Sequence, residues 1–209
     1  MNTNAIVSRF LDRTTLSAAL TELLGTFLLA FVAFQTGNAF AVGLTLLVLV
    51  YTIGDKSGAH VNPAVTTGLM FVGRFPFASG IVYIVFQVLG ALLGRLAAWP
   101  VEDQLSPFVL ATDTASIPPD GGFLGEFLGV VFLMFAVMAV VSGRVERSVS
   151  GFVIGIGFTV GLAATGGILN PAIGLVSLSL FGTIMPFLGA VVAAYLAVFA
   201  LRNVRPPQS

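Results

Sequence analysis

The residues of this chain best suited to bind a polar molecule are two copies of the tripeptide Asn-Pro-Ala, because both lie within otherwise apolar sequence. They occur at Asn62-Pro63-Ala64 and Asn170-Pro171-Ala172. An asparagine before a helix can accept a hydrogen bond from a backbone N–H, and proline fits the first helical position because it has no N–H to leave unpaired. The amide N–H groups of each asparagine then remain free, and they could donate hydrogen bonds to a neutral polar molecule.

A single Asn-Pro-Ala is most simply a turn that starts a helix. Here each copy precedes a short apolar run, at 62–72 and at 170–180. About ten residues of helix rise roughly 15 Å, which is half the thickness of a bilayer. We therefore predict two re-entrant half-helices that begin at mid-membrane, one in each half of the chain.

Composition indicates that the whole chain is embedded in a membrane. Of its 209 residues, 57% are apolar and 9% are charged, whereas about a quarter of the residues of a soluble domain are charged. Six further apolar runs are long enough to span a bilayer: 15–35, 38–54, 78–99, 122–142, 150–166 and 183–201. The expected fold is an all-α integral membrane protein, with residues 1–209 forming one transmembrane domain.

The composition also argues against several classes of function. The net charge of zero gives no reason to expect a nucleic-acid partner. The absence of cysteine excludes disulfides, zinc–thiolate sites and thiol catalysis. We expect no cofactor and no metal.

Landmarks recur in the same order in both halves, which predicts an internal repeat. Glu22 and Gly25 in the first span match Glu126 and Gly129 in the fourth, just as Asn62 matches Asn170. The expected organisation is repeat 1 at about 15–99, an external loop at 100–121 and repeat 2 at about 122–201. Since each repeat has three spans, an odd number, the second is inverted relative to the first.

The basic residues predict the orientation. If the spans alternate, eight of the nine basic side chains fall on one side. These eight are Arg9, Arg13, Lys56, Arg74, Arg144, Arg147, Arg202 and Arg205. By the positive-inside rule we expect a multi-pass protein of the plasma (inner) membrane with both termini in the cytoplasm.

Glu22 and Glu126 are carboxylates within apolar spans, where a charge is costly and a role is expected. Either they form a proton relay, or each accepts N–H bonds from the non-helical stretch before its Asn-Pro-Ala. The symmetry of the pair favours the structural role. Gln87, also inside a span, is expected to bond to neighbouring helices or loop backbone.

His60 is the sole histidine and stands two residues before Asn62. It could line a pore or pack within the loop, and the sequence leaves both interpretations open. Ser57 nearby suggests a hydrolytic nucleophile with His60 as its base, but no orienting acid is evident, and we predict no enzyme. Tyr83, Trp99 and Phe108 are expected as anchors at the membrane interface.

At this point the sequence resembles the major intrinsic protein family, the aquaporins and glycerol facilitators. The resemblance rests on Ser57-Gly58-Ala59-His60-Val61-Asn62-Pro63-Ala64-Val65-Thr66, on the second Asn-Pro-Ala, and on Glu22, Glu126 and Gln87. It implies six tilted spans plus two half-helices, one pore in each subunit and usually a homotetramer.

The resemblance also implies a second constriction of the pore, towards the outside, where the family typically has an arginine after the second Asn-Pro-Ala. That position is Ile173 here, and the other three match Val42, Gly167 and Ala164, with Leu162 as the alternative to Ala164. Without a guanidinium the ring loses several donors and a positive charge. With Gly167 and Ala164 in it, we expect the ring to be wide and apolar.

The leading hypothesis is a passive channel for water, with small neutral solutes such as glycerol, urea or ammonia as further candidates. One alternative is an ion-leaky or proton-coupled pathway that uses Glu22, Glu126 and His60. Another is a structural membrane protein whose pore is blocked.

Overall fold

The computed structural model describes residues 13–105 and 121–201, and these ranges contain eight α-helices and one short 3-10 helix. Six helices are long and apolar enough to cross a membrane, as the sequence predicted. They are α2 (Arg13–Thr36), α3 (Ala39–Ser57), α5 (Phe77–Leu105), α6 (Gly122–Val141), α7 (Ser150–Thr165) and α9 (Leu180–Leu201). The two half-helices are α4 (Pro63–Phe71) and α8 (Pro171–Val176), and the 3-10 helix η1 is Arg147–Val149.

The lengths of some helices differ from the prediction. The helix α5 continues to Leu105, past the predicted end at 99, so the external loop expected at 100–121 begins later; its residues 106–120 and Phe108 lie outside the described residues. The half-helix expected at 170–180 is wrong in length, because α8 ends at Val176. Leu178 adopts a left-handed φ of 59°, which a helix cannot continue through. Ser179 then starts α9, and its Oγ accepts the N–H of Gly182 at 2.8 Å.

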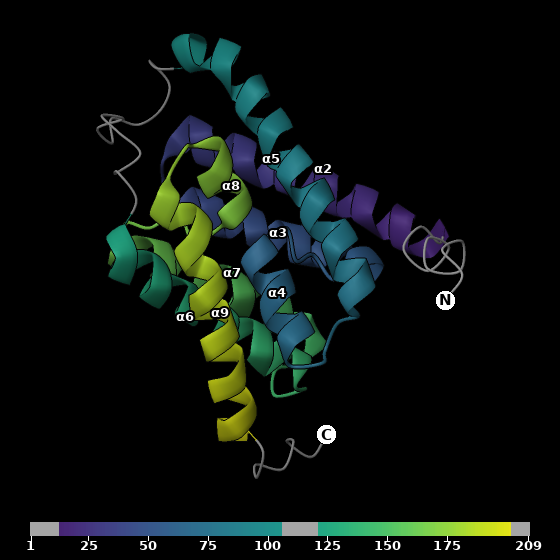
Figure 1. The fold of residues 1–209 in the computed structure, drawn as a ribbon. Helices are drawn as coiled ribbons and strands as arrows, with labels where there is room; N and C mark the ends of the chain where they lie inside the picture. Colours follow the sequence, from purple (N-terminus) through teal and green to yellow (C-terminus); the bar gives the residue numbers. More distant parts are fainter. Residues whose placement is uncertain (1–12, 106–120, 202–209) are drawn as a thin grey trace.

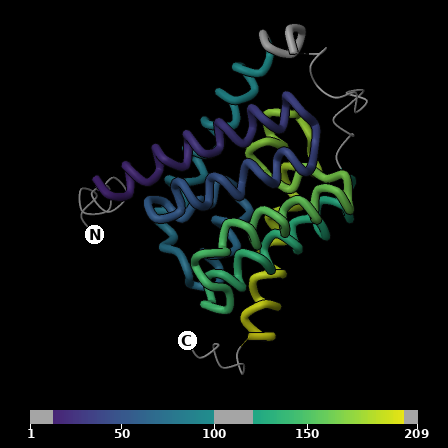
Figure 2. The backbone as a smooth tube through the Cα atoms, turned by 180° about the vertical axis from the view of Figure 1, so that it is seen from behind, coloured from purple at the N-terminus to yellow at the C-terminus, as the bar shows by residue number. Residues whose placement is uncertain are grey.

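The helices pack in pairs that repeat between the two halves. In Figure 1, α2 lies against α5 and α6 lies against α9, and Figure 2 shows α3 beside α7. Glycines allow the close approach at equivalent places. A Cβ on Gly90 would lie 2.3 Å from the Leu23 carbonyl oxygen of α2, and one on Gly189 would lie 2.5 Å from the Phe127 oxygen of α6. In lipid, where helices gain little from apolar burial, such small residues let the backbones touch.

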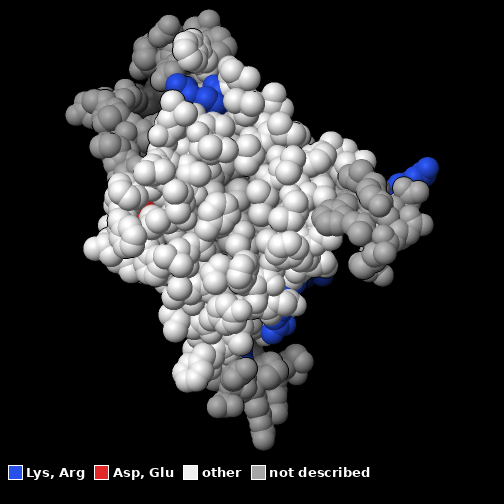
Figure 3. Space-filling view, in the orientation of Figure 1, with Lys and Arg blue, Asp and Glu red and all other residues white. Residues whose placement is uncertain are grey.

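The surface of the bundle suits a bilayer. Large apolar side chains are exposed along all six long helices, for example Leu24, Val48, Leu92, Leu128, Phe152 and Tyr195. In the face shown in Figure 3, Lys and Arg occur near the edges, and the broad area between them is white apart from one small red area towards the left. Trp99 is exposed, in agreement with an interfacial anchor, but Tyr83 is buried and that prediction is wrong. We find Tyr83 in a polar network beneath α4, described below.

Candidate functional site

The two half-helices begin as the tripeptides predict. Asn62 and Asn170 are extended, at φ −157° and −140°, and stand directly before α4 and α8. The Oδ1 of Asn62 accepts the N–H of Ala64 at 2.8 Å, and that of Asn170 accepts the N–H of Ala172 at 3.1 Å. Pro63 and Pro171 occupy the first helical positions. Each tripeptide therefore forms a capped helix start that leaves the amide nitrogen of its asparagine for another partner.

The amide nitrogens join the two halves of the molecule at the centre of the bundle. The Nδ2 of Asn62 donates to the Leu169 carbonyl at 2.9 Å, and the Nδ2 of Asn170 donates to the Val61 carbonyl at 3.0 Å. The expectation that these amides are wholly free is therefore wrong. An amide NH₂ carries two hydrogens, so each asparagine keeps one after this exchange. The loops before α4 and α8 are locked together by two reciprocal bonds.

Both loops are held in an unfavourable backbone conformation. Val61 has a φ of 41° and Leu169 a φ of 56°, and each immediately precedes an asparagine. Left-handed backbone is a clear outlier for a β-branched residue and costs on the order of 1–3 kcal/mol per residue. The strain turns the carbonyls of Val61 and Leu169 towards the opposite half, where the asparagines meet them.

The buried carboxylates stabilise these strained loops. Glu22 accepts the N–H groups of His60 at 3.0 Å and Val61 at 2.6 Å. Glu126 accepts those of Ile168 at 2.7 Å and Leu169 at 2.8 Å. These are the two residues before each asparagine, and both carboxylates are fully buried. The geometry agrees with the structural interpretation, because each carboxylate accepts N–H groups from the loop before its asparagine.

A larger polar network surrounds Glu22. The Nε2 of Gln87 donates to Glu22 Oε2 at 2.8 Å and to Thr66 Oγ1 at 3.0 Å, which ties α5 to both α2 and α4. Ser57 Oγ donates to Glu22 Oε1 at 2.6 Å. The hydroxyl of Tyr83 donates to the Ser57 carbonyl at 2.9 Å. The sequence indicated Gln87 and Glu22 but not Thr66, and it suggested a different place for Tyr83, because no local pattern indicates contacts between such distant segments.

His60 packs within the loop and also borders a cavity. Its Nδ1 lies 3.1 Å from Thr66 Oγ1, and its ring packs edge-on against Phe75 and Tyr83. It also lines a cavity of about 210 Å³ together with Gly58 and Ala59. We call this space the His60 cavity. Its wall is otherwise mainly apolar, with Leu46, Val65, Leu133, Val137 and Ile154, and Asp55 and Arg147 form an ion pair there.

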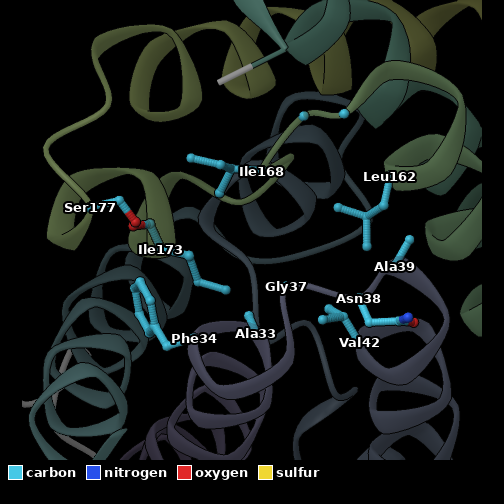
Figure 4. Close-up of a pocket in the computed structure, with 12 residues that line it drawn as sticks. Ala33, Phe34, Gly37, Asn38, Ala39, Val42, Leu162, Ile168, Ile173 and Ser177 are labelled. Atoms are coloured by element: carbon cyan, nitrogen blue, oxygen red, sulfur yellow. The ribbon is translucent and has the colours of Figure 1, made fainter. Parts of the chain in front are cut away.

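A second cavity, of about 100 Å³, lies beyond the asparagines and contains Ile173 (Figure 4). We call it the Ile173 cavity. Its lining residues are Ala33, Phe34, Gly37, Asn38, Ala39, Val42, Leu162, Gly166, Gly167, Ile168, Ile173 and Ser177. Three of the four residues predicted for a constriction, Val42, Gly167 and Ile173, are among them. The local sequence gave no sign of the contributions of Phe34 and Ile168.

The fourth predicted residue, Ala164, is wrong. It is exposed and does not line the Ile173 cavity, whereas Leu162, the alternative, does. Successive helical residues are rotated by about 100°, so positions 162 and 164 of α7 lie on nearly opposite faces. The set of Val42, Leu162, Gly167 and Ile173, which we call the apolar ring, is therefore bulkier than the sequence suggested.

The two cavities share no lining residue, and the two cross-bonded loops contribute to different ones, His60 to the first and Ile168 to the second. Asn62 is 2% exposed and Asn170 is fully buried, and neither belongs to the lining of either cavity. The site therefore consists of two mainly apolar spaces and a polar junction, formed where the loops are cross-bonded at the starts of α4 and α8.

A comparison with models of known protein families matches residues 9–201 to the family described as Major intrinsic protein. The chain belongs to the major intrinsic protein family. Individual relatives agree with this. It is 36% identical to nodulin-26 of Glycine max over 149 residues. This aligned region covers 65% of this chain and 52% of that protein. It is 32% identical to a probable glycerol uptake facilitator protein of Thermotoga maritima over 144 residues. This aligned region covers 62% of this chain and 61% of that protein.

A solved structure shows the same fold. The X-ray structure of the aquaglyceroporin from Plasmodium falciparum superposes with a TM-score of 0.66 at 23% identity, covering 87% of this chain and 95% of that one. The fold is thus the six-span, two-half-helix architecture of the major intrinsic protein family. In the curated relatives above, the matched region is between 52% and 61% of their length.

The hydrolase interpretation finds no support in the geometry of this family member. Ser57 Oγ donates its proton to Glu22, while the His60 ring pairs with Thr66 through Nδ1. A serine nucleophile needs its hydroxyl bonded to the base that removes its proton. Among the described residues, no group of three or more His, Asp and Glu could hold a metal ion.

Proposed function

We propose that this chain is a passive, bidirectional channel for water and small neutral solutes. The observation that carries the proposal is the polar junction between the two cavities, where Asn62 and Asn170 cross-bond the strained loops. Each asparagine retains one amide hydrogen for a passing molecule. A channel of this kind lets solutes follow their gradients, and it needs neither a nucleotide nor a coupled ion.

In this proposal the non-helical stretches 58–61 and 166–169 supply the polar groups along the path. The carbonyls of Val61 and Leu169 already accept from the two asparagines. The carbonyls of residues 58–60 and 166–168 lie outside the helices, and in this proposal a solute exchanges its water shell for them. Irregular backbone is tolerated at membrane depth where it lines such a path. His60 adds a polar ring nitrogen on one side of the junction.

The apolar ring acts as the narrow gate on the other side of the junction. Val42, Leu162 and Ile173 present only hydrocarbon side chains, and Gly167 presents backbone. With Leu162 in place of Ala164, we expect a ring narrower than the sequence alone indicated. Water remains a suitable solute because it is small, while large polyols are disfavoured.

The arrangement in the cell is part of the same proposal. We infer both termini in the cytoplasm of a plasma (inner) membrane protein, with the Ile173 cavity facing outwards and the His60 cavity inwards, because Lys56, Arg74, Arg144 and Arg147 then lie inside. Fold-level analogy with the family supports a homotetramer with one pore per subunit.

Stopped-flow light scattering tests the channel directly. Purified protein in proteoliposomes is mixed with sucrose, and the shrinkage rate is compared with that of empty liposomes. We expect a several-fold faster rate with a low activation energy. Shrinkage no faster than in empty vesicles, from protein that elutes as a single folded species, would refute the channel and favour the structural or blocked-pore alternative.

A further inference from the structure

The segment that joins α4 to α5 combines aromatic rings with one positive charge. Its sequence is Phe71-Val72-Gly73-Arg74-Phe75-Pro76-Phe77, and we call it the 71–77 turn. In Figure 1 it lies at the end of the bundle where α4 leads into α5, away from α8. Phe71 and Phe77 are 54% and 64% exposed, and Arg74 is exposed, whereas Phe75 is half-buried. The turn therefore presents two apolar rings and a cation to its surroundings.

The backbone of this turn is fixed by hydrogen bonds at the end of α4. Gly73 has a left-handed φ of 69°. Its N–H donates to the Met70 carbonyl at 3.0 Å, and the Arg74 N–H donates to the Leu69 carbonyl at 2.8 Å. This pair of bonds is the Schellman motif, in which glycine adopts the left-handed conformation at little cost. The Arg74 side chain is therefore presented from a rigid turn.

The guanidinium of Arg74 has no hydrogen-bond or ion-pair partner among the residues that the structure describes. A second Gly-Arg turn, Gly143-Arg144 after α6, is closed in the same way, since the Arg144 N–H donates to the Ala139 carbonyl at 2.9 Å. There the guanidinium is used within the protein and donates to the Leu201 carbonyl of α9 at 3.2 Å. The sequence also contains no Asp or Glu between residues 56 and 101 that could neutralise Arg74. Its charge is therefore available to a negative group from outside the chain.

We propose that Phe71, Arg74 and Phe77 form a binding site for the phosphate headgroup of an anionic lipid. A guanidinium can donate two parallel hydrogen bonds to a phosphate group. Exposed apolar rings are stabilised at the boundary between headgroups and acyl chains, and a free phosphate ion would gain nothing from them. In the orientation of the proposed channel, the turn faces the inner leaflet, which carries the anionic lipids. The choice of leaflet and the effect on flux rest on the channel function proposed above, whereas the binding itself does not.

The 71–77 turn also contacts the lining of the His60 cavity. The ring centroid of Phe75 lies 4.7 Å from that of His60 and 4.8 Å from that of Tyr83. His60 in turn lines the cavity. One side chain therefore connects the lipid-binding residues with the path of the solute. A bound headgroup restrains the turn and holds Phe75 against His60. Because a ligand stabilises the conformation that binds it, the lipid should favour the arrangement in which this cavity is open.

Native mass spectrometry of the purified protein with added phosphatidylglycerol or phosphatidylcholine tests the site. Arg74→Gln should weaken phosphatidylglycerol binding by about five- to tenfold, the effect of one cation beside a phosphate. Arg74→Lys keeps the charge without the planar fork, so it should lose less. Arg13→Gln is the matched control, because it removes an exposed cation at the start of α2, outside the 71–77 turn.

Two results would overturn the lipid site. One is an equal loss of phosphatidylglycerol binding in Arg74→Gln and Arg13→Gln, or no loss in either, because the site would then be no more than general surface charge. The other is displacement of the lipid by inorganic phosphate at a similar concentration, because the exposed rings of Phe71 and Phe77 would then contribute nothing.

The effect on the channel is measured as water flux by stopped-flow scattering, in phosphatidylcholine vesicles with and without phosphatidylglycerol. We expect the flux per protein to be about two- to fivefold higher with phosphatidylglycerol, and Arg74→Gln should lose this difference. Phe75→Leu should still bind the lipid but should also lose the difference, because it removes the ring that contacts His60. Retained lipid binding shows that the turn of this variant is intact.

The possible failures are distinguishable. Flux that is equal in both lipids for the unchanged protein, or a lipid effect that persists in Phe75→Leu, overturns the connection to His60. Arg74-dependent lipid binding without water flux in any vesicle refutes the proposed channel and leaves the lipid site standing.

Discussion

Replacing Glu22 by glutamine should destabilise the protein, because this carboxylate uses both oxygens as acceptors. Oε1 accepts from Ser57 Oγ and the His60 N–H, and Oε2 accepts from the Val61 N–H and Gln87 Nε2. A glutamine retains one acceptor oxygen and turns an NH₂ group towards the donors of the other. In either orientation at least one buried backbone N–H loses its partner.

The expected size of the effect follows from these bonds. One or two buried donors without partners cost about 1–3 kcal/mol each, and the charge-assisted character of the remaining bonds is also lost. The total is on the order of 2–5 kcal/mol. For a chain of this length each kcal/mol shifts the melting temperature by about 2–4 °C, so we expect a decrease of roughly 4–20 °C. The strained backbone at Val61 has its main support removed, so water flux should fall as well.

Thermal unfolding of detergent-solubilised protein, followed by the fluorescence of the single tryptophan, measures this change. Glu146→Gln is the control, since the same chemical change is made on an exposed side chain near η1. An unchanged melting temperature in Glu22→Gln, together with loss of a proton current present in the original protein, would refute the structural role and establish the proton relay.

Three further changes test other parts of the structure. Gly174→Ala places a Cβ 2.4 Å from the backbone of α9 and should lower the melting temperature by several degrees, as in overpacked cores. In Gly54→Ala the added Cβ lies 3.9 Å from its nearest neighbouring atom. The free energy of unfolding should rise by about 0.5–1 kcal/mol through helix propensity, and the melting temperature should therefore rise slightly. Ile173→Arg should abolish any glycerol flux while water flux persists, measured by stopped flow under glycerol and sucrose gradients; equal loss of both would show that the ring is simply blocked. Asp55→Asn should change stability by less than about 1 kcal/mol, because the side chains of Asp55 and Arg147 are 85% and 83% exposed, and a large decrease in its melting temperature would contradict this.

Much of the fold could be predicted from the repeated tripeptide, because its residues have a strong local preference for the start of a helix. An asparagine and a proline at a helix start have few alternatives, and their position in each apolar half indicated the half-helices and the inversion. The six spans followed from apolar length alone. By contrast, the end of α8 depends on the left-handed backbone of Leu178. Leucine has no preference for this conformation, so the sequence does not indicate the turn.

The site was predictable where it depended on one segment and unpredictable where it depended on several. The choice between Ala164 and Leu162 required the rotation of α7 about its axis. That rotation is set by packing against α3 and α6 and not by the apolar pattern, since nearly every residue of α7 is apolar. The hydrogen bonds from Asn62 and Asn170 to carbonyls of the opposite loop could not be predicted either. They depend on the relative position of two loops that are far apart in the sequence.

The reciprocal bonds between the two loops have a consequence for how the protein is assembled. Each long helix can enter the bilayer by itself, but α4 and α8, at nine and six residues, are too short to cross it. The Val61 carbonyl finds its donor only in the second half of the chain, and the Leu169 carbonyl only in the first. Neither loop can be satisfied during synthesis until both halves are in the membrane. The junction therefore forms only after the chain has been synthesised and inserted through Asn170, so its closure follows the insertion of both halves.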